Sequence, residues 1–486
     1  LMDSVQNVEW MAMWETNRGC PFACTFCDWG SAIASKVNDF DLDRLKKEID
    51  WFSDNKVGFV LGADANFGIK KRDLDIANYL AKRKSDSGYP HTFRVSYTKN
   101  STEKIFDVAK VLYDSEMLKG VCLSMQSMNK ETLVSIKRDN ISLEVFHELQ
   151  TLYNREGVPT FTELIIALPG ETYNSFIDGI DKLLENGQHS QLIIYNCTVM
   201  PNAEIGEPEY QEKYGVQTVE IPIFTAHSSP NSTDPIIEYE PIVVGTDSMD
   251  TNDWHRTYNF AWAVQCFHTL GLFQYVAIFL RNYAQVFYKD FYEALIFYAK
   301  SNPDTLIGQE FQNVNKILDG VLRGRGFDQY FLEFSDISWP MEEASLIRFS
   351  QNGDHLYKDL VNFLEKFFKK NKISINKNLL TDLISLQKQV VVNPDAKGVI
   401  ELNLCADIPE FIHSIRNGEK SVLKLNPVTY EIDRGQGFGG DKKKYAHEVV
   451  WFGRKGGKYF YPLIKKKYGP QKSIKLYQQV ISKYIF

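Results

Sequence analysis

The feature that most constrains this chain of 486 residues is an alternation of apolar runs with amphipathic helical patterns, from residue 40 to about residue 200. The apolar runs have the length and the β-branched content of buried strands, and one further run precedes residue 40. Repeated βα units predict a parallel sheet, because parallel neighbours need a crossover connection. The six expected strands span 12–15, 57–61, 92–97, 120–125, 161–168 and 192–197.

The expected helices lie between these strands, at 42–55, 74–84, 104–115, 130–137, 143–156 and 172–185. Six βα units predict an α/β fold of partial TIM-like (β/α)6 type, in which the chemistry sits at the carboxyl ends of the strands. We expect a mainly helical α+β region to follow. The predicted domains are 1–215 for the barrel, 216–300 for a connection with aromatic helices, and 301–486 for a C-terminal α+β domain.

Two further segments carry expectations about local structure. The Pro-rich segment 202–241 is expected to be an irregular connection that crosses the surface. The stretch 257–280 carries no formal charge, but Asn259, Gln265 and His268 interrupt it. It therefore predicts a buried helix rather than a membrane span.

Composition narrows the class of protein. The chain has 62 acidic and 55 basic residues, a net charge of −7, and no basic tail, so nothing supports binding to nucleic acid. With 44% hydrophobic and 13% aromatic residues, it is typical of an ordered globular protein. The first residues lack the basic and apolar parts of a secretory signal, which predicts a cytoplasmic location.

Three of the seven cysteines, Cys20, Cys24 and Cys27, stand together in the phrase ETNRGCPFACTFCDWG. Three thiolates on one tight loop can ligate three irons of a 4Fe-4S cluster and leave the fourth iron open as a reaction site. A structural zinc site needs four closed ligands. The next candidates, His91 and Cys122, lie more than 60 residues further along the chain. An iron-sulfur cluster in a reducing compartment is the favoured interpretation.

The loop resembles the signature of the radical S-adenosylmethionine (SAM) superfamily, with Phe26 in the aromatic position before the third cysteine. The resemblance covers roughly residues 10–215. It implies that the three cysteines ligate the cluster and that the amine and carboxylate of SAM chelate the open iron. It also implies that one electron cleaves the sulfonium to give a 5′-deoxyadenosyl radical. The cofactors carry this chemistry, while the protein supplies binding, orientation and exclusion of water.

Polar residues near the strand ends extend the resemblance. Asp64 and Asn66, in LGADANFGI, stand where the superfamily presents polar groups to the SAM ammonium; a helix N-cap is the alternative. Ser124 and Gln126, in CLSMQSMN, stand where residues face the ribose or carboxylate of SAM, and the period of two places both on one side.

The next two strands would lie beside the adenine by the same resemblance. Glu163 is in TELIIALPGET, and its orientation, inward or outward, is left open. In this strand Ala167 stands where the superfamily usually has Gly. Met200 and Pro201, in YNCTVMPNA, stand where family members close over the adenine. No residue is assigned a catalytic role.

Other residues are interpreted from the pattern alone. Arg94, Ser96 and Lys99 alternate with apolar residues in FRVSYTKN. They could therefore point together toward a carboxylate, although each could instead lie on the surface. Cys122 and Cys197 are expected to be buried apolar residues.

The longer phrase ETNRGCPFACTFCDWGSAIASKV is similar to cobalamin-dependent radical SAM proteins, many of which methylate unactivated carbons of peptides or natural products. These normally carry a preceding cobalamin domain, often with Asp-x-His-x-x-Gly. Here Tyr258 replaces the glycine after Asp253-Trp254-His255, so His255 is expected to be a capping or core histidine. Cobalamin is expected on an upstream domain or a separate chain, and these 486 residues are expected to bind it weakly or not at all.

The leading hypothesis is a radical SAM enzyme of the methyltransferase class that abstracts hydrogen from a small-molecule or peptide substrate for cobalamin-dependent C-methylation. A one-electron donor such as flavodoxin or ferredoxin would reduce it. One alternative is a cobalamin-free radical SAM epimerase, dehydrogenase or rearrangement enzyme. Another is a non-catalytic iron-sulfur protein, which cleavage of SAM by the reduced protein would exclude.

Overall fold

The computed structural model describes residues 8–29, 36–98, 103–118, 120–229, 236–451 and 463–467. Its N-terminal part contains the six parallel strands that the apolar runs predict. They are β1 (Trp10–Trp14), β4 (Val57–Phe67), β5 (Thr92–Tyr97), β6 (Val121–Cys122), β7 (Thr160–Ile166) and β8 (Gln191–Asn196).

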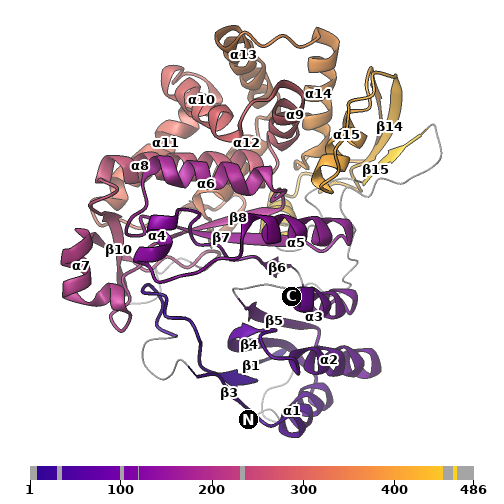
Figure 1. The fold of residues 1–486 in the computed structure, drawn as a ribbon. Coiled ribbons are helices and arrows are strands. Elements are labelled where there is room, and N and C mark those ends of the chain that lie inside the picture. The colour runs from indigo at the N-terminus through magenta and orange to yellow at the C-terminus, as the bar shows by residue number, and fades with distance from the viewer. Residues whose placement is uncertain are drawn as a thin grey trace.

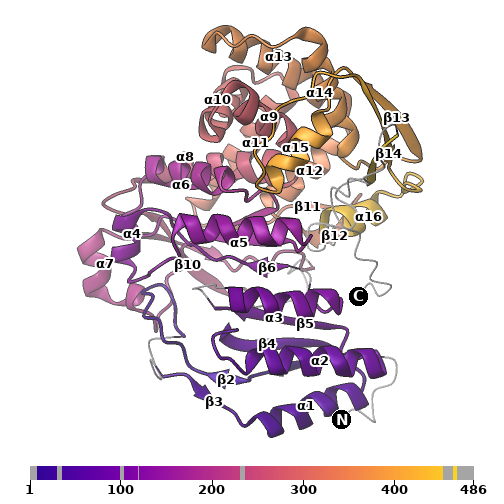
Figure 2. The ribbon, with the colours of Figure 1, turned by 45° about the vertical axis from the view of Figure 1, so that its right-hand side comes forward.

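The helices between the strands also confirm the prediction to within a few residues. They are α1 (Leu42–Asp54), α2 (Asp73–Ser87), α3 (Glu103–Asp114), α4 (Lys130–Ser135), α5 (Leu143–Arg155) and α6 (Tyr173–Glu185). Side chains of Asp41, Ser142 and Thr172 accept hydrogen bonds from the first turns of α1, α5 and α6, which fixes where these helices begin. In Figure 2, α1, α2, α3 and α5 lie one above another in chain order, beside the strands.

The strands form two parallel three-stranded sheets, β1-β4-β5 and β6-β7-β8, in chain order. This is the partial TIM-like core that the sequence predicts, with a break in the hydrogen-bonded ladder between β5 and β6. The β6 ladder is shorter than expected. Four residues beyond the end of β6, Gln126 has φ 62°, a left-handed conformation that no extended strand can contain. The same residue forms an isolated bridge to Leu164 of β7.

The two faces of the sheet differ in exposure. On the helix side, Trp14 packs edge-on against Phe52 of α1 and Phe93 of β5. On the opposite, concave face, Met11 and Met13 are 65% and 73% exposed. The concave face therefore stays open along β1 in the part of the chain that the structure describes.

The expectation of an irregular connection at 202–241 is wrong for 204–222 and for 239–241, and residues 230–235 of that segment lie outside the described ranges. It forms a short 3-10 turn η2 (Glu204–Gly206), helix α7 (Pro208–Tyr214) and an antiparallel pair, β9 (Gln217–Pro222) with β10 (Tyr239–Gly245). The prolines that suggested irregularity occupy sites that accept proline. Pro208 opens α7, and Pro222 and Pro241 lie in a two-stranded ribbon with free edges.

The remaining chain is mainly helical, with small sheets, as the α+β prediction requires (Figure 1). The helices α8 and α10 pack against α6, which joins this region to the barrel. The domain limits at 215 and 300 stay predictions. The elements are α8 (Thr251–Ala263), η4 (Val264–Thr269), α9 (Gln274–Ala284), α10 (Tyr288–Ser301), α11 (Leu306–Val321), β11 (Tyr330–Phe331), β12 (Ser335–Ser338), α12 (Met341–Ser350), α13 (Gly353–Asn371), α14 (Lys377–Val390), β13 (Val399–Leu404), α15 (Ile408–Arg416), β14 (Val428–Asp433), α16 (Lys442–Tyr445), η5 (Ala446–Trp451) and β15 (Leu463–Lys466).

The apolar stretch 257–280 is buried, as expected, but it is not one helix. The α8 helix continues into the π-helical turn η4, breaks, and resumes as α9, and the two helices are bent by 94°. Within the described ranges no single helix is long and apolar enough to cross a membrane, and this bent pair is the one combination that passes the same test.

Candidate functional site

The three cysteines lie on the loop that follows β1, at the carboxyl end of the parallel strands. Cys20 and Cys24 are 2% and 5% exposed, and Cys27 is half-buried. Gly19 has φ 110°, a conformation that favours glycine, and it turns the chain into the loop just before Cys20. The backbone N–H of Cys27 donates to the carbonyl of Cys24, so the last two thiols share one tight turn.

Contacts at Thr25 dock this loop onto the barrel. Its N–H donates to the carbonyl of Ile136 at 3.1 Å, and its carbonyl accepts from Ile205 at 2.9 Å. Its hydroxyl lies 3.0 Å from the Tyr210 hydroxyl of α7. The segment expected to be irregular therefore helps to hold the cysteine loop.

The arrangement of thiols argues against a mononuclear metal site. Among the described residues, no three His, Cys, Asp or Glu side chains converge closely enough to hold a single ion. A 4Fe-4S cluster makes a different demand, because each thiolate binds its own iron at a separate corner. Three thiols on one loop, without a fourth ligand at the same point, fit that demand and not a closed zinc site.

The carboxylate of Asp64, near the end of β4, accepts hydrogen bonds from the backbone that leads into the loop. It accepts from the N–H of Thr16 at 3.0 Å, from the Thr16 hydroxyl at 2.8 Å and from the N–H of Asn17 at 2.7 Å. Burial raises the pKa of Asp64, and these hydrogen bonds oppose that shift. Contact with the SAM ammonium stays a prediction, but the carboxylate has a structural task that the sequence did not reveal.

Asn66 lies two residues beyond Asp64 on β4 and contacts the first cysteine directly. Its amide nitrogen Nδ2 donates to Sγ of Cys20 at 3.2 Å. Its Oδ1 is buried and has no hydrogen-bond partner among the described residues. A buried acceptor without a partner costs about 1 to 3 kcal/mol, so this atom is suited to a ligand donor such as an ammonium group.

The turn after Asn66 depends on a buried carboxylate with a perturbed pKa. Oδ2 of Asp73 accepts from the N–H groups of Gly68 and Lys70, and burial raises the pKa of Asp73 from 3.8 to about 6. The folded protein therefore binds more protons than the unfolded chain between these two values. We expect the free energy of unfolding to fall by about 3 kcal/mol as the pH rises from about 4 to about 6.

Urea denaturation across this pH range would measure the slope, with Asp73→Asn as the test variant and Asp75→Asn, an exposed site on the same helix, as the control. The Asp73 variant should lose most of the slope and the control should keep it. Equal slopes in both variants would contradict the assignment.

Ser124, Gln126 and Glu163 form one hydrogen-bonded group. The Ser124 hydroxyl donates to Oε2 of Glu163 at 3.2 Å and accepts from Nε2 of Gln126. Glu163 therefore points toward the segment that follows β6, and its inward or outward orientation in the barrel stays a prediction. Oε1 of Gln126 is buried and has no partner in the described part of the chain, as for Asn66 Oδ1.

Arg138 is a residue of this site that sequence reasoning missed. It is 4% exposed, and it donates through Nη2 to the carbonyl of Ser124 and through Nε to Oδ1 of Asn140 at 2.8 Å. Burial lowers the pKa of Arg138, and Cys24 opposes that shift, first through its charge and then as a hydrogen-bond partner. A charged residue three positions after the end of α4 was the available signal, but helix ends often carry exposed arginines.

These observations place three thiols, two buried acceptors that have no partner among the described residues, and a buried guanidinium at or beyond the carboxyl ends of β1, β4 and β6. Residues 14–209 match the family model described as the Radical SAM superfamily. They form a radical SAM domain. This family implies a 4Fe-4S cluster and SAM as cofactors, and the donor set described above fits both.

The relatives of this radical SAM domain include two curated methyltransferases. The chain is 41% identical over 303 residues to the cobalamin-dependent radical SAM methyltransferase TokK of Streptomyces tokunonensis, covering 62% of this chain and 44% of TokK. It is 39% identical over 312 residues to the 2-(S-pantetheinyl)-carbapenam-3-carboxylate methyltransferase of Streptantibioticus cattleyicolor, covering 64% of this chain and 46% of that enzyme. The chain thus spans less than half the length of each relative.

Among solved structures, the radical SAM methyltransferase TsrM of Kitasatospora setae is 16% identical and covers 43% of this chain and 41% of its own. The TM-score is 0.37. This similarity is too low to carry an argument about fold or activity.

The other predicted residues of the radical SAM domain are less closely grouped. Phe26 is half-buried and packs against the core, whereas Met200 is 45% exposed. Ala167 has φ 62°, so it adopts the conformation for which the glycine usual at this position is suited. Burial raises the pKa of Cys197 to about 12, as expected for an inert buried thiol.

Two of the three alternating polar residues in and after β5 are exposed, and the third lies outside the described residues. Arg94 and Ser96 are exposed, and Arg94 lies in register with Leu61 of β4 and through it with Met13 of β1. This row belongs to the concave face. Lys99 lies outside the described residues. On α8, His255 lies 3.5 Å from the Asp319 carboxylate, which is a structural setting of the kind expected for it.

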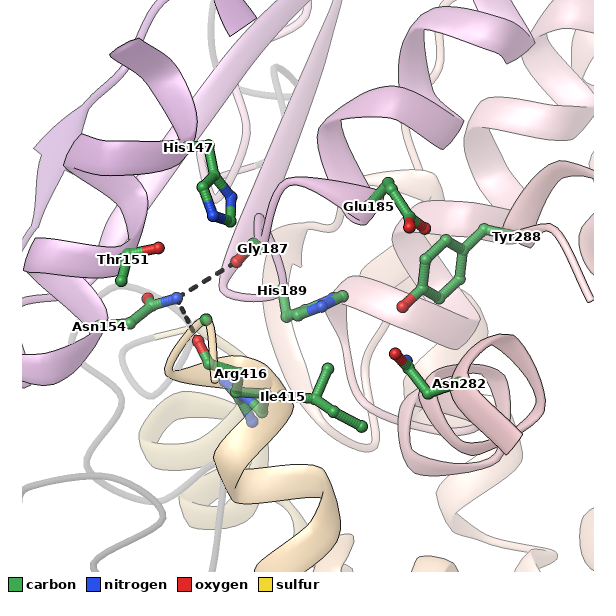
Figure 3. A pocket seen from close by; sticks show the side chains of 11 residues that line it. His147, Thr151, Asn154, Glu185, Gly187, His189, Asn282, Tyr288, Ile415 and Arg416 are labelled. Atoms are coloured by element: carbon green, nitrogen blue, oxygen red, sulfur yellow. Dashed lines mark hydrogen bonds between the residues drawn. The ribbon is translucent and has the colours of Figure 1, made fainter. Parts of the chain in front are cut away.

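A small cavity at the opposite end of the strands is not part of this site. It has a volume of about 40 Å³ and is lined by residues that include Asn154, His189 and Arg416 (Figure 3). Nδ2 of Asn154 donates to the carbonyls of Gly187 and Arg416, which ties α5 to α15. Because barrels of this type carry their chemistry at the carboxyl ends of the strands, we interpret the cavity as a packing feature.

Proposed function

We propose that this protein is a radical SAM enzyme of the methyltransferase class, in which Cys20, Cys24 and Cys27 ligate a 4Fe-4S cluster. When bound, the reduced cluster supplies the electron that cleaves SAM and so generates the radical that abstracts hydrogen from substrate. The observation that carries the proposal is that three thiols share the strand ends with Asn66 Oδ1 and Gln126 Oε1, two acceptors without a partner among the residues that the structure describes.

The residues of the chain would divide the binding of SAM between them. Asn66 Oδ1 is an acceptor for the ammonium group, and Asp64 holds the backbone before the loop. The group formed by Ser124, Gln126 and Glu163 offers two acceptor side chains and one hydroxyl to the ribose. Phe26 and Met200 supply apolar surface beside the adenine.

The substrate side of the proposal rests on the concave face. Arg94 and Ser96 are exposed there beside apolar neighbours, which suits a small molecule or peptide that carries a carboxylate next to an apolar part. One relative is named for a substrate with a carboxylate. We propose C-methylation of such a substrate with cobalamin, carried on another part of the protein or on a partner, and reduction by a flavodoxin or ferredoxin in the cytoplasm.

Glu163 gives a direct test of SAM binding. Loss of one charge-assisted hydrogen bond costs about 1.5 to 3 kcal/mol, so Glu163→Gln should weaken SAM binding roughly ten- to a hundredfold. Equilibrium binding of SAM to the reconstituted protein would measure the dissociation constant. Glu144→Gln, an exposed site on α5, is the control and should bind SAM normally. Equal affinities would remove Glu163 from the SAM site.

The class of reaction is tested with the reduced protein and SAM. Formation of 5′-deoxyadenosine would exclude a non-catalytic iron-sulfur protein. Transfer of a labelled methyl group to substrate only when a corrinoid is supplied would support the methyltransferase proposal. Turnover of substrate without corrinoid and without methyl transfer would instead support an epimerase, dehydrogenase or rearrangement enzyme.

A further inference from the structure

One buried amide donates to a sulfur of the cysteine loop, and a buried guanidinium lies on the segment that is hydrogen-bonded to the same loop. Nδ2 of Asn66 lies 3.2 Å from Sγ of Cys20, and Asn66 is 1% exposed. A thiolate can only accept hydrogen bonds, so the amide must present its N–H group to the sulfur. The bond is therefore a fixed N–H···S interaction, closed to water by burial.

The second group is the Arg138 guanidinium, which is 4% exposed. The carbonyl of Ile136 accepts from the N–H of Thr25, which places the segment before Arg138 against the residue that follows Cys24. Two guanidinium nitrogens have partners, whereas Nη1 is buried and has no hydrogen-bond partner in the described ranges. Burial lowers the pKa of Arg138, and the negative charge of a Cys24 thiolate opposes that shift.

We propose that Asn66 and Arg138 raise the reduction potential of the cluster by stabilising negative charge on the sulfurs of Cys20 and Cys24. The inference rests on the proposed function, because it requires the cluster to be bound. Reduction adds one electron, supplied by an external one-electron donor, and increases the negative charge on the cluster and its thiolates. A hydrogen bond or a buried cation at a thiolate therefore favours the reduced form over the oxidised form.

Comparison of Arg138 with its neighbour Lys137 shows why a cation must be buried to influence the cluster. Lys137 is exposed and pairs with Glu204 at 2.6 Å. Its charge is both compensated and screened by water. Arg138 is the next residue along the chain, but it is buried against the loop. Asn66 and Arg138 are thus positioning and tuning residues, and neither replaces a cluster ligand.

The test is a redox titration of the anaerobically reconstituted protein without SAM, followed by the electron paramagnetic resonance signal of the reduced cluster. In Asn66→Leu and in Arg138→Gln, we expect the ratio of reduced to oxidised cluster at a fixed potential to fall about tenfold. This corresponds to a decrease of about 59 mV for a one-electron couple. Arg138→Lys keeps the charge and should restore most of the ratio.

Lys137→Gln and Asn55→Leu are the matched controls, because they remove a charge and an amide at exposed sites. Both should titrate like the parent protein. Iron and sulfide content is measured in every sample. A parent protein that holds no cluster would refute the proposed function, whereas full clusters with an unchanged midpoint in both test variants would overturn this inference alone.

A measurement on the unaltered protein covers the case in which a variant fails to hold its cluster. Protein with 15N-labelled asparagine should show a nitrogen coupling to the reduced cluster by pulsed paramagnetic resonance. The coupling expected from Asn66 requires the short path through the N–H···S bond to Cys20. Its absence would overturn the assignment of Asn66.

Discussion

Replacement of Cys20, Cys24 and Cys27 together by alanine is expected to abolish the iron-sulfur cluster and, with it, all cleavage of SAM. The three thiols share one loop, and within the described ranges no three His, Cys, Asp or Glu side chains converge as a rival metal site. Iron and sulfide analysis with visible absorption should show a fall from about four irons per chain to almost none. No 5′-deoxyadenosine should form in the presence of a reductant.

Three other cysteines provide a matched control for this experiment. Cys197, Cys266 and Cys405 lie outside the loop, and their joint replacement by alanine removes the same number of thiols. That protein should retain its cluster, although loss of the two buried side chains should lower its stability. Retention of a full cluster in the loop variant would refute the assignment of the metal ligands.

Asp64→Ala is expected to destabilise the cysteine loop and reduce the amount of cluster that the protein retains. The substitution leaves the N–H groups of Thr16 and Asn17 buried without their acceptor. At about 1 to 3 kcal/mol for each group, the loss should reach roughly 2 to 6 kcal/mol. Denaturation of the protein and its iron content after reconstitution would measure the two effects.

Asp64→Asn separates this structural role from a direct contact with SAM. The amide keeps one oxygen acceptor for the backbone, so we expect a smaller loss of stability and a cluster content close to normal. A variant with a full cluster but weak SAM binding would show the ammonium contact that the sequence predicts. A full cluster together with normal SAM binding in Asp64→Ala would show that the carboxylate is dispensable.

Most of the barrel follows from local pattern. Strands such as β4 and β7 can be predicted from their continuous apolar runs, because both of their faces are at least half-buried. Helices such as α6 can be predicted because they carry one apolar face and begin at a capping residue. The prediction of an irregular connection at 202–241 fails because proline alone does not distinguish an irregular loop from the start of a helix or from a strand at a free edge. Pairing of β9 with β10 is a contact between segments distant in sequence.

For the site, the sequence by itself determined the three cysteines, since their spacing on one loop carries the chemistry without reference to the rest of the chain. It also grouped Ser124 with Gln126, which the structure joins by a hydrogen bond although neither residue lies within β6. Only the tertiary structure decided that Asp64 supports the loop, that Asn66 donates to Cys20 and that Arg138 lies buried beside Cys24. These roles depend on distances between atoms more than 40 residues apart in the chain, in contacts that no local periodicity encodes.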